Sequence, residues 1–138
     1  MRTLLCISSA LLLAACASQQ QAPTMSAPVT TASGLVYQSL HEGSGTPPKA
    51  TDVVKVHYRG TFPDGKEFDA SMDKPAEFPL NRVIKCWTEG VQMMKPGGKA
   101  KLICPPQIAY GEKGAGGGVI PPNATLHFEV ELLDVTRK

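Results

Sequence analysis

The sequence predicts an α+β fold in which an antiparallel, curved sheet of five to six strands wraps around one short helix. The segment 125–135 alternates apolar and polar side chains, which is typical of a strand with one buried face. The segment 83–94 places apolar side chains at spacings of 3, 4 and 3, which is typical of one face of a helix. Gly and Pro make 13 + 12 = 25 of the 138 residues, so frequent turns are expected and a helical bundle is not.

The remaining strands are expected in chain order before the helix and directly after it. Residues 34–41 (GLVYQSLH) and 53–59 (VVKVHYR) are predicted strands, separated by the Gly- and Pro-containing loop 42–48. Residues 63–65 (Pro-Asp-Gly) predict a turn, because Pro presets φ and Gly permits a positive φ. The strands on either side of this turn should therefore pair as a hairpin. Residues 99–104 (KAKLIC) alternate and end at two prolines, as a strand would.

The helix and the last strand each have a well-defined apolar face. The predicted helix ends before Pro96-Gly97-Gly98, which cannot continue it. Its apolar face consists of Ile84, Trp87, Val91 and Met94. The apolar face of the last strand consists of Leu126, Phe128, Val130 and Leu132, and its polar face of His127, Glu129 and Glu131.

The first 15 residues resemble the signal peptide of a bacterial lipoprotein. Arg2 supplies a positive charge, an apolar stretch follows, and the small residues Ala14 and Ala15 stand directly before Cys16. In lipoproteins such a Cys receives lipid, so Cys16 is the expected lipidation site and a membrane anchor. The alternative is an ordinary secretory signal with an incidental Cys. Because residue 17 is Ala and not Asp, the expected location is the outer membrane of the bacterial envelope, facing the periplasm.

Two further parts follow the signal peptide. Residues 16–33 are uncharged, rich in Gln, Ser, Thr, Ala and Pro, and without an apolar period, which predicts a flexible tether after the lipidated Cys. Residues 34–138 are the expected folded domain. The formal net charge is only +2, so no strong basic field exists to bind nucleic acid.

The cysteines predict one disulfide in the domain. Cys6 leaves with the signal peptide and Cys16 carries lipid, so Cys86 and Cys104 remain as a pair in an oxidising compartment. The alternative is two buried free thiols. No spacing of Cys and His suggests a metal site, and we expect no metal.

Five ordered motifs within residues 34–138 resemble those of the FKBP-type peptidyl-prolyl cis-trans isomerases. They are Val56–Gly60 (VHYRG), Asp64–Ser71 (DGKEFDAS), Val83–Gly90 (VIKCWTEG), Ala109–Gly111 (AYG), and Val119–Leu126 (VIPPNATL) followed by Phe128–Leu132 (FEVEL). The resemblance covers nearly all of the domain. It implies the family's fold, a sheet curled around a short helix, and its activity, the acceleration of rotation about Xaa-Pro bonds in exported or envelope proteins.

The resemblance also implies a pocket and the residues that form it. Trp87 corresponds to the pocket floor, Tyr110 to the residue whose hydroxyl meets a ligand carbonyl, and Ile84 to a backbone N–H donor. The expected catalytic positions are Tyr58, Phe68, Asp69, Trp87, Tyr110 and Phe128, and the expected substrate-binding positions are Phe78, Val83, Ile84, Val119 and Ile120. From periodicity alone, ordinary core is the better explanation of Trp87, Phe68, Phe128 and Val83, and the motif match is what favours the pocket. Tyr58 could likewise be a strand aromatic, and Asp69 a turn or helix-capping residue.

The chemistry of the reaction explains these residue types. Rotation about an Xaa-Pro amide breaks no bond to protein or water, so neither a nucleophile nor a cofactor is needed. A dry apolar pocket favours the twisted amide, in which charge separation is reduced. The expected partners are therefore unfolded or flexible proline-containing polypeptides. The resemblance to the family further implies macrolide inhibitors as possible ligands. An alternative function is a membrane-anchored proline-peptide-binding or chaperone module without turnover.

The sequence departs from the family pattern at several points. Cys86 replaces a frequent Gly. The segment between Asp69 and Phe78 is shorter than usual and Ala76 stands where some members have an aromatic side chain, so one pocket wall should be more open, which argues against tight macrolide binding. The Gly-rich segment 111–118 lacks the Lys-Ser/Thr of a phosphate-binding loop and is expected to be a flap beside the pocket. His57 should face away from Tyr58, its neighbour on the strand, and we assign it a structural role. A long N-terminal dimerisation helix is not expected in residues 17–33, so we expect a monomer.

Overall fold

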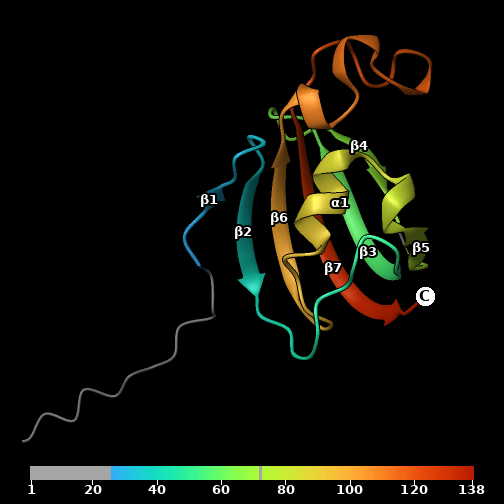
Figure 1. The fold of residues 1–138 in the computed structure, drawn as a ribbon. Coiled ribbons are helices and arrows are strands. Elements are labelled where there is room, and N and C mark those ends of the chain that lie inside the picture. Colours follow the sequence, from blue (N-terminus) through green and yellow to red (C-terminus); the bar gives the residue numbers. More distant parts are fainter. Residues whose placement is uncertain (1–25, 72) are drawn as a thin grey trace, which may run out of the picture.

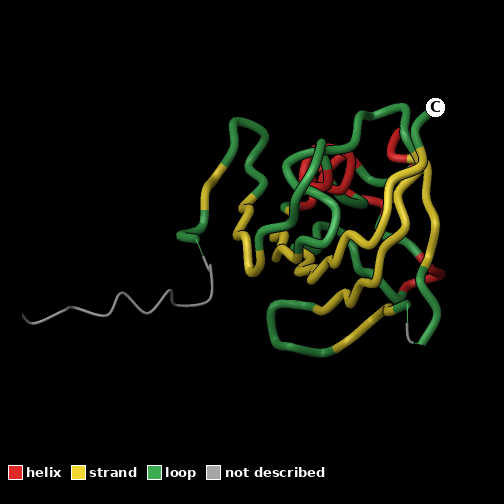
Figure 2. The backbone as a smooth tube through the Cα atoms, turned by 90° about the horizontal axis from the view of Figure 1, so that it is seen from below, coloured by secondary structure: helices red, strands yellow, loops and turns green. Residues whose placement is uncertain are grey.

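A computed structural model describes residues 26–71 and 73–138, and in this part the predicted fold is confirmed. One antiparallel sheet has the strand order β1-β2-β6-β7-β3-β4, and β5 also pairs with β3 (Figure 1). Its strands are β1 (Val29–Thr30), β2 (Val36–His41), β3 (Val53–Thr61), β4 (Glu67–Ala70), β5 (Ala76–Pro79), β6 (Lys99–Cys104) and β7 (Leu126–Thr136). The helix α1 (Lys85–Val91) lies against one face of the sheet, and Figure 2 shows the strands curving around it.

Strand β7 is the centre of the sheet, paired with β3 on one side and β6 on the other. Its alternation is the predicted one, because Leu126, Phe128, Val130 and Leu132 are all buried. These side chains face α1 and form most of the core together with residues from β3 and β6. The apolar pattern therefore determines which face of the sheet the helix covers.

Helix α1 is shorter than the predicted 83–94 but buries the predicted face. Trp87, Val91 and Met94 are buried, while Ile84 stands just before the first helical residue. Close packing on the sheet depends on Gly90, where an added Cβ would lie 2.8 Å from a methyl carbon of the buried Leu102. The side chain of Thr88 donates a hydrogen bond to the carbonyl of Leu80, 2.6 Å away, and so ties α1 to the segment before it.

Two strands of the structure were not predicted. β5 adds to the edge of β3, with Phe78 opposite Val54. β1 lies in the segment 16–33 that was expected to be a flexible tether, and it pairs with β2 through Val29 opposite Tyr37. Strand pairing therefore starts five residues before Gly34, the expected first residue of the domain.

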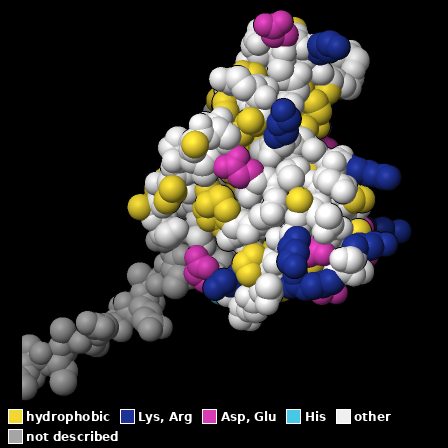
Figure 3. Space-filling model, viewed as in Figure 1, with side chains coloured by type: hydrophobic (Ala, Val, Ile, Leu, Met, Phe, Trp, Pro, Cys, Tyr) yellow, Lys and Arg dark blue, Asp and Glu magenta, His cyan; other side chains and the backbone are white. Residues whose placement is uncertain are grey.

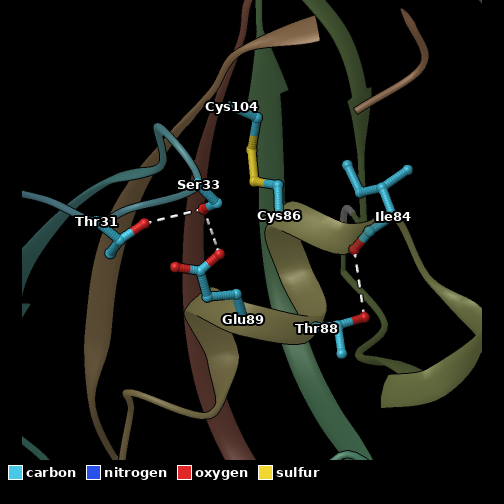
Figure 4. The surroundings of a disulfide bond; sticks show 7 residues. All are labelled: Thr31, Ser33, Ile84, Cys86, Thr88, Glu89 and Cys104. Atoms are coloured by element: carbon cyan, nitrogen blue, oxygen red, sulfur yellow. Dashed lines mark hydrogen bonds between the residues drawn. A yellow bond between two sulfur atoms is a disulfide. The ribbon is translucent and has the colours of Figure 1, made fainter. Parts of the chain in front are cut away.

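The segment around β1 is also attached to α1. The Ser33 hydroxyl donates a hydrogen bond to the Glu89 carboxylate and is itself hydrogen-bonded to Thr31 (Figure 4). The expected signal peptide 1–15, Cys16 and the first part of the expected tether lie outside the described residues. Within the described part, no helix is long and apolar enough to cross a membrane.

The sulfur atoms of Cys86 and Cys104 are bonded in the structure, joining the first turn of α1 to the end of β6 (Figure 4). Their Cα atoms are 5.7 Å apart, within the usual range for disulfides, and both residues are fully buried. This pairing is the one that the sequence predicts.

A buried carboxylate, Asp52, connects the chain's C-terminal end to the loop before β3. It accepts hydrogen bonds from the backbone N–H groups of Lys49 (2.8 Å) and Lys138 (3.2 Å), and it forms an ion pair with Arg137 (3.3 Å). These contacts, first among them the Lys49 N–H, lower the pKa of Asp52 below its ordinary value of 3.8. The ionised carboxylate is thus the form that the fold stabilises.

We expect Asp52→Asn to lower the free energy of unfolding at neutral pH and to matter less in acid. Because the pKa of Asp52 is lower in the folded state, its contribution is fully present only well above the ordinary value of 3.8 and is lost as the pH falls through the folded-state pKa. Urea unfolding of both proteins at pH 7 and at pH 3 measures this. A difference between the two proteins that grew towards pH 3 would contradict the assignment.

Candidate functional site

A cavity of about 440 Å³ opens beside α1, between the sheet and the loop that follows β6. It is lined by Tyr58, Asp69, Phe78, Arg82, Val83, Ile84, Trp87, Tyr110 and Phe128. These residues come from β3, β4, β5, α1, β7, the 3₁₀ turn η1 (Leu80–Arg82) and the segments around these elements. The curvature of the sheet brings them together, because no two neighbouring elements alone could enclose such a space.

The floor of the cavity is the indole of Trp87, which is 5% exposed. Three rings meet it edge to face, with centroid distances of 5.2 Å to Tyr58, 5.7 Å to Phe78 and 5.4 Å to Phe128. Such perpendicular contacts are the favoured geometry of aromatic pairs. The four rings, Tyr58, Phe78, Trp87 and Phe128, are called the aromatic cluster below, and they give the cavity rigid, apolar walls.

Few polar groups enter the cavity, and the phenols among them are neutral. The Tyr58 hydroxyl donates to the Asp69 carboxylate (2.9 Å), whose other oxygen accepts from the backbone N–H of Ala70 (2.8 Å). Burial, followed by the hydrogen bond to Asp69, raises the pKa of Tyr58 to about 12. Burial and the charge of Asp69 also raise the pKa of Tyr110. Both phenols therefore keep their protons at neutral pH.

Several donors of the lining residues, among them the buried indole N–H of Trp87, have no acceptor among the described residues. The Tyr110 hydroxyl, on a side chain 38% exposed, makes no hydrogen bond there, and neither does the backbone N–H of Ile84. Ile84 uses only its carbonyl, which accepts from the N–H groups of Trp87 and Thr88 at the start of α1. The Tyr110 hydroxyl and the Ile84 N–H are thus available to the carbonyl groups of a bound ligand.

The structure brings together eight of the eleven predicted pocket residues. The eight are Tyr58, Asp69, Phe78, Val83, Ile84, Trp87, Tyr110 and Phe128. Phe68 lies one layer behind the wall, with its ring 5.6 Å from that of Phe128 and 4.9 Å from that of Phe62. Gly60 makes room for this layer, because an added Cβ would lie 2.6 Å from the Phe68 ring and 2.9 Å from that of Phe128.

Val119 and Ile120, which were expected to bind substrate, do not line this cavity. A bridge between Ala115 and Ile120 turns the side chain of Ile120 into the core, where it is 7% exposed. Val119 then points outwards, 56% exposed, and lines a separate groove beside Phe62. The bridge between Ala115 and Ile120 accounts for this arrangement, and the local sequence does not reveal it.

Arg82 lines the cavity although the sequence interpretation did not select it. Its only sequence signal is its place directly before Val83 and Ile84.

His57, expected to be structural, lies on the other face of the sheet, where its ring nitrogen is 3.1 Å from the Ser71 hydroxyl. In the described part of the chain, no three His, Cys, Asp or Glu side chains are grouped as metal ligands.

Comparison with known proteins places this geometry in a family. A family model described as FKBP-type peptidyl-prolyl cis-trans isomerase matches residues 44–133. A "Probable FKBP-type peptidyl-prolyl cis-trans isomerase" of Haemophilus influenzae is 53% identical over 111 residues, which cover 79% of this chain and 46% of that protein. "FK506-binding protein 1A" of Emericella nidulans is 50% identical over 107 residues, 74% of this chain and 98% of that protein.

A solved structure agrees with the sequence relatives. The crystal structure of FkpA from Escherichia coli superimposes with a TM-score of 0.76 at 52% identity, covering 80% of this chain and 52% of that chain. This chain thus spans less than half the length of the Haemophilus influenzae relative but nearly all of the fungal one.

Proposed function

Because the chain belongs to the FKBP-type peptidyl-prolyl cis-trans isomerase family, we propose that it accelerates cis–trans rotation of Xaa-Pro bonds in exported or envelope proteins. The observation that carries this proposal is the aromatic cluster, a rigid apolar cavity with neutral donors at its edge. A proline ring fits such a cavity by shape and polarity. The lining includes no Ser, Cys or His that could act as a nucleophile or base, in keeping with a rotation that needs neither.

The proposed mechanism is selective stabilisation of the twisted amide. The planar amide is held by resonance, with a rotation barrier of about 18–20 kcal/mol. Twisting removes the resonance and reduces the charge separation, so transfer from water to the apolar cavity favours the twisted form over either planar form. The Tyr110 hydroxyl and the Ile84 N–H orient the flanking carbonyls. A barrier lowered by about 4 kcal/mol would accelerate rotation ~10³-fold.

The test is cis–trans exchange of an Xaa-Pro peptide, followed by NMR with and without the purified protein. We expect faster exchange with the protein, and at least a tenfold smaller acceleration with Asp69→Leu, because the Tyr58 hydroxyl then loses its acceptor and the cavity its polar edge. Tyr110→Phe should slow exchange by a smaller factor, because it removes one hydroxyl and retains the ring.

Each variant is compared by circular dichroism, so that only folded proteins are interpreted. If the folded wild-type protein left the exchange rate unchanged, the isomerase proposal would be wrong. The aromatic cluster would then serve a proline-binding or chaperone module without turnover, which is the alternative function.

Macrolides such as the FK506 named in the fungal relative are proposed to occupy the same cavity.

We further propose that the protein is a lipoprotein anchored through Cys16 at the outer membrane and facing the periplasm. The support is the small residues directly before Cys16 at the end of an apolar stretch that is too short to remain as a spanning helix. We expect Cys16→Ser to move the protein from the membrane fraction to the soluble fraction of bacterial cells. An unchanged membrane fraction would contradict the anchor.

A further inference from the structure

Among the described residues, two charged side chains line the cavity, Asp69 and Arg82, and they differ in their hydrogen bonding. Both oxygens of Asp69 already accept hydrogen bonds, one from Tyr58 and one from the Ala70 N–H. Arg82 is exposed and forms no hydrogen bond or ion pair with any described residue. The guanidinium is therefore a free cation with five donors at the mouth of an otherwise apolar space.

The two charges enter the cavity from opposite ends. Asp69 lies on β4 and pairs with Gly60, near one end of β3. Arg82 lies on η1, which directly follows Pro79. Pro79 pairs with Val53, at the other end of β3. Figure 3 shows Lys and Arg side chains gathered on the side of the molecule that holds β5 and the C-terminus. Among the residues that line the cavity, the positive charge thus lies at the end formed by η1.

We propose that Arg82 is a specificity-determining residue, which selects polypeptides with an Asp or Glu side chain directly before or after the proline. The inference rests on the proposed function, since it assumes that a proline ring occupies the aromatic cluster. A residue adjacent to that proline must leave the cavity at its mouth, within reach of a long Arg side chain. A carboxylate there finds an unused guanidinium, with which it can form two parallel hydrogen bonds.

The effect should be a moderate preference that depends on salt. Arg82 is exposed, and ion pairs at exposed sites are weakened by water and by dissolved ions. We expect a Glu-containing peptide to be preferred about two- to fivefold over its Gln counterpart at low ionic strength. In 0.5 M salt the preference should largely disappear.

The experiment uses the purified full chain and two pairs of peptides, with Glu or Gln either before or after a single proline. Two quantities are measured for each peptide, the NMR exchange rate and the affinity from Trp87 fluorescence. Trp87 is the chain's single tryptophan and forms the cavity floor, so its emission reports binding even if no peptide is accelerated. Failure of catalysis and failure of the charge preference are therefore distinguishable.

Charge variants at position 82 test whether the Arg82 guanidinium causes the preference for Glu over Gln. We expect the Glu-to-Gln ratio to fall to about one in Arg82→Gln, to invert in Arg82→Glu and to be mostly retained in Arg82→Lys. Lys85→Gln is the matched control: it removes an exposed positive charge three residues away that does not line the cavity, and it should leave the ratio unchanged. Equal ratios in wild type and Arg82→Glu for both peptide pairs would overturn the proposal, as would an equal loss in Lys85→Gln.

Discussion

Replacing Trp87 by Ala is expected to lower the free energy of unfolding by about 3–5 kcal/mol, the usual cost of truncating a buried large aromatic side chain. The indole is in contact with three rings from β3, β5 and β7, so its loss leaves a void that no single neighbour can fill. A domain with a typical stability of about 5–15 kcal/mol would lose a large fraction of it. Peptide binding should be lost as well, because the floor of the cavity is removed.

Urea unfolding followed by circular dichroism is the appropriate measurement, because this variant has no tryptophan whose fluorescence could be used. Met93→Ala serves as the control: its side chain lies just beyond α1 but is 41% exposed, and it should change stability by no more than about 0.5 kcal/mol. Trp87→Phe retains one aromatic ring, so its loss in free energy of unfolding should lie between those of Trp87→Ala and Met93→Ala. Wild-type stability in Trp87→Ala would contradict the burial of the indole.

The sequence predicts the elements whose patterns are local. The alternation of β7 and the apolar face of α1 each repeat with the period of their own backbone, so Leu126, Phe128, Trp87 and Val91 were assigned correctly to the core. The turn at 63–65 likewise contains its own signal, and β3 and β4 pair on either side of it. Such features need no knowledge of the rest of the chain.

Features that depend on distant partners were not predictable in this way. β5 contains four residues ending in Pro79 and has no clear alternation, so it is a strand only because β3 offers it an edge. β1 has just two residues and depends in the same way on β2. The contact of Asp52 with Arg137 joins residues 85 positions apart, and no local pattern indicates it.

In the candidate site, too, local sequence patterns and contacts between distant parts of the chain must be distinguished. Most of its residues were assigned through resemblance to a family, since periodicity alone explains Trp87 or Phe128 as core. Val119, expected to bind substrate, lies outside the cavity in this structure, because the bridge between Ala115 and Ile120 decides which of two adjacent apolar residues turns inwards; its role in binding stays a prediction. Arg82 was missed because its position at the cavity mouth exists only once η1 is folded against β3.

Removing the disulfide in the double variant Cys86→Ala, Cys104→Ala is expected to lower the free energy of unfolding by about 3 kcal/mol. The two residues are 18 positions apart, and closing a loop of this length restricts the unfolded chain by about that amount. Urea unfolding compares the double variant with the oxidised wild-type protein. Wild type under reducing conditions is the matched control, because it loses the same bond without a change of side chain.

The effect should extend to the functional site. Cys86 directly precedes Trp87, so the bond to β6 fixes the first turn of α1 and with it the indole that forms the cavity floor. We therefore expect the double variant to bind proline peptides more weakly even under conditions in which it remains folded. Thiol counting on a denatured, unreduced chain with Cys6 and Cys16 replaced by Ser should find no free thiol. Two free thiols in protein exported by bacteria would show that the bond does not form there, and reduction would then leave stability unchanged.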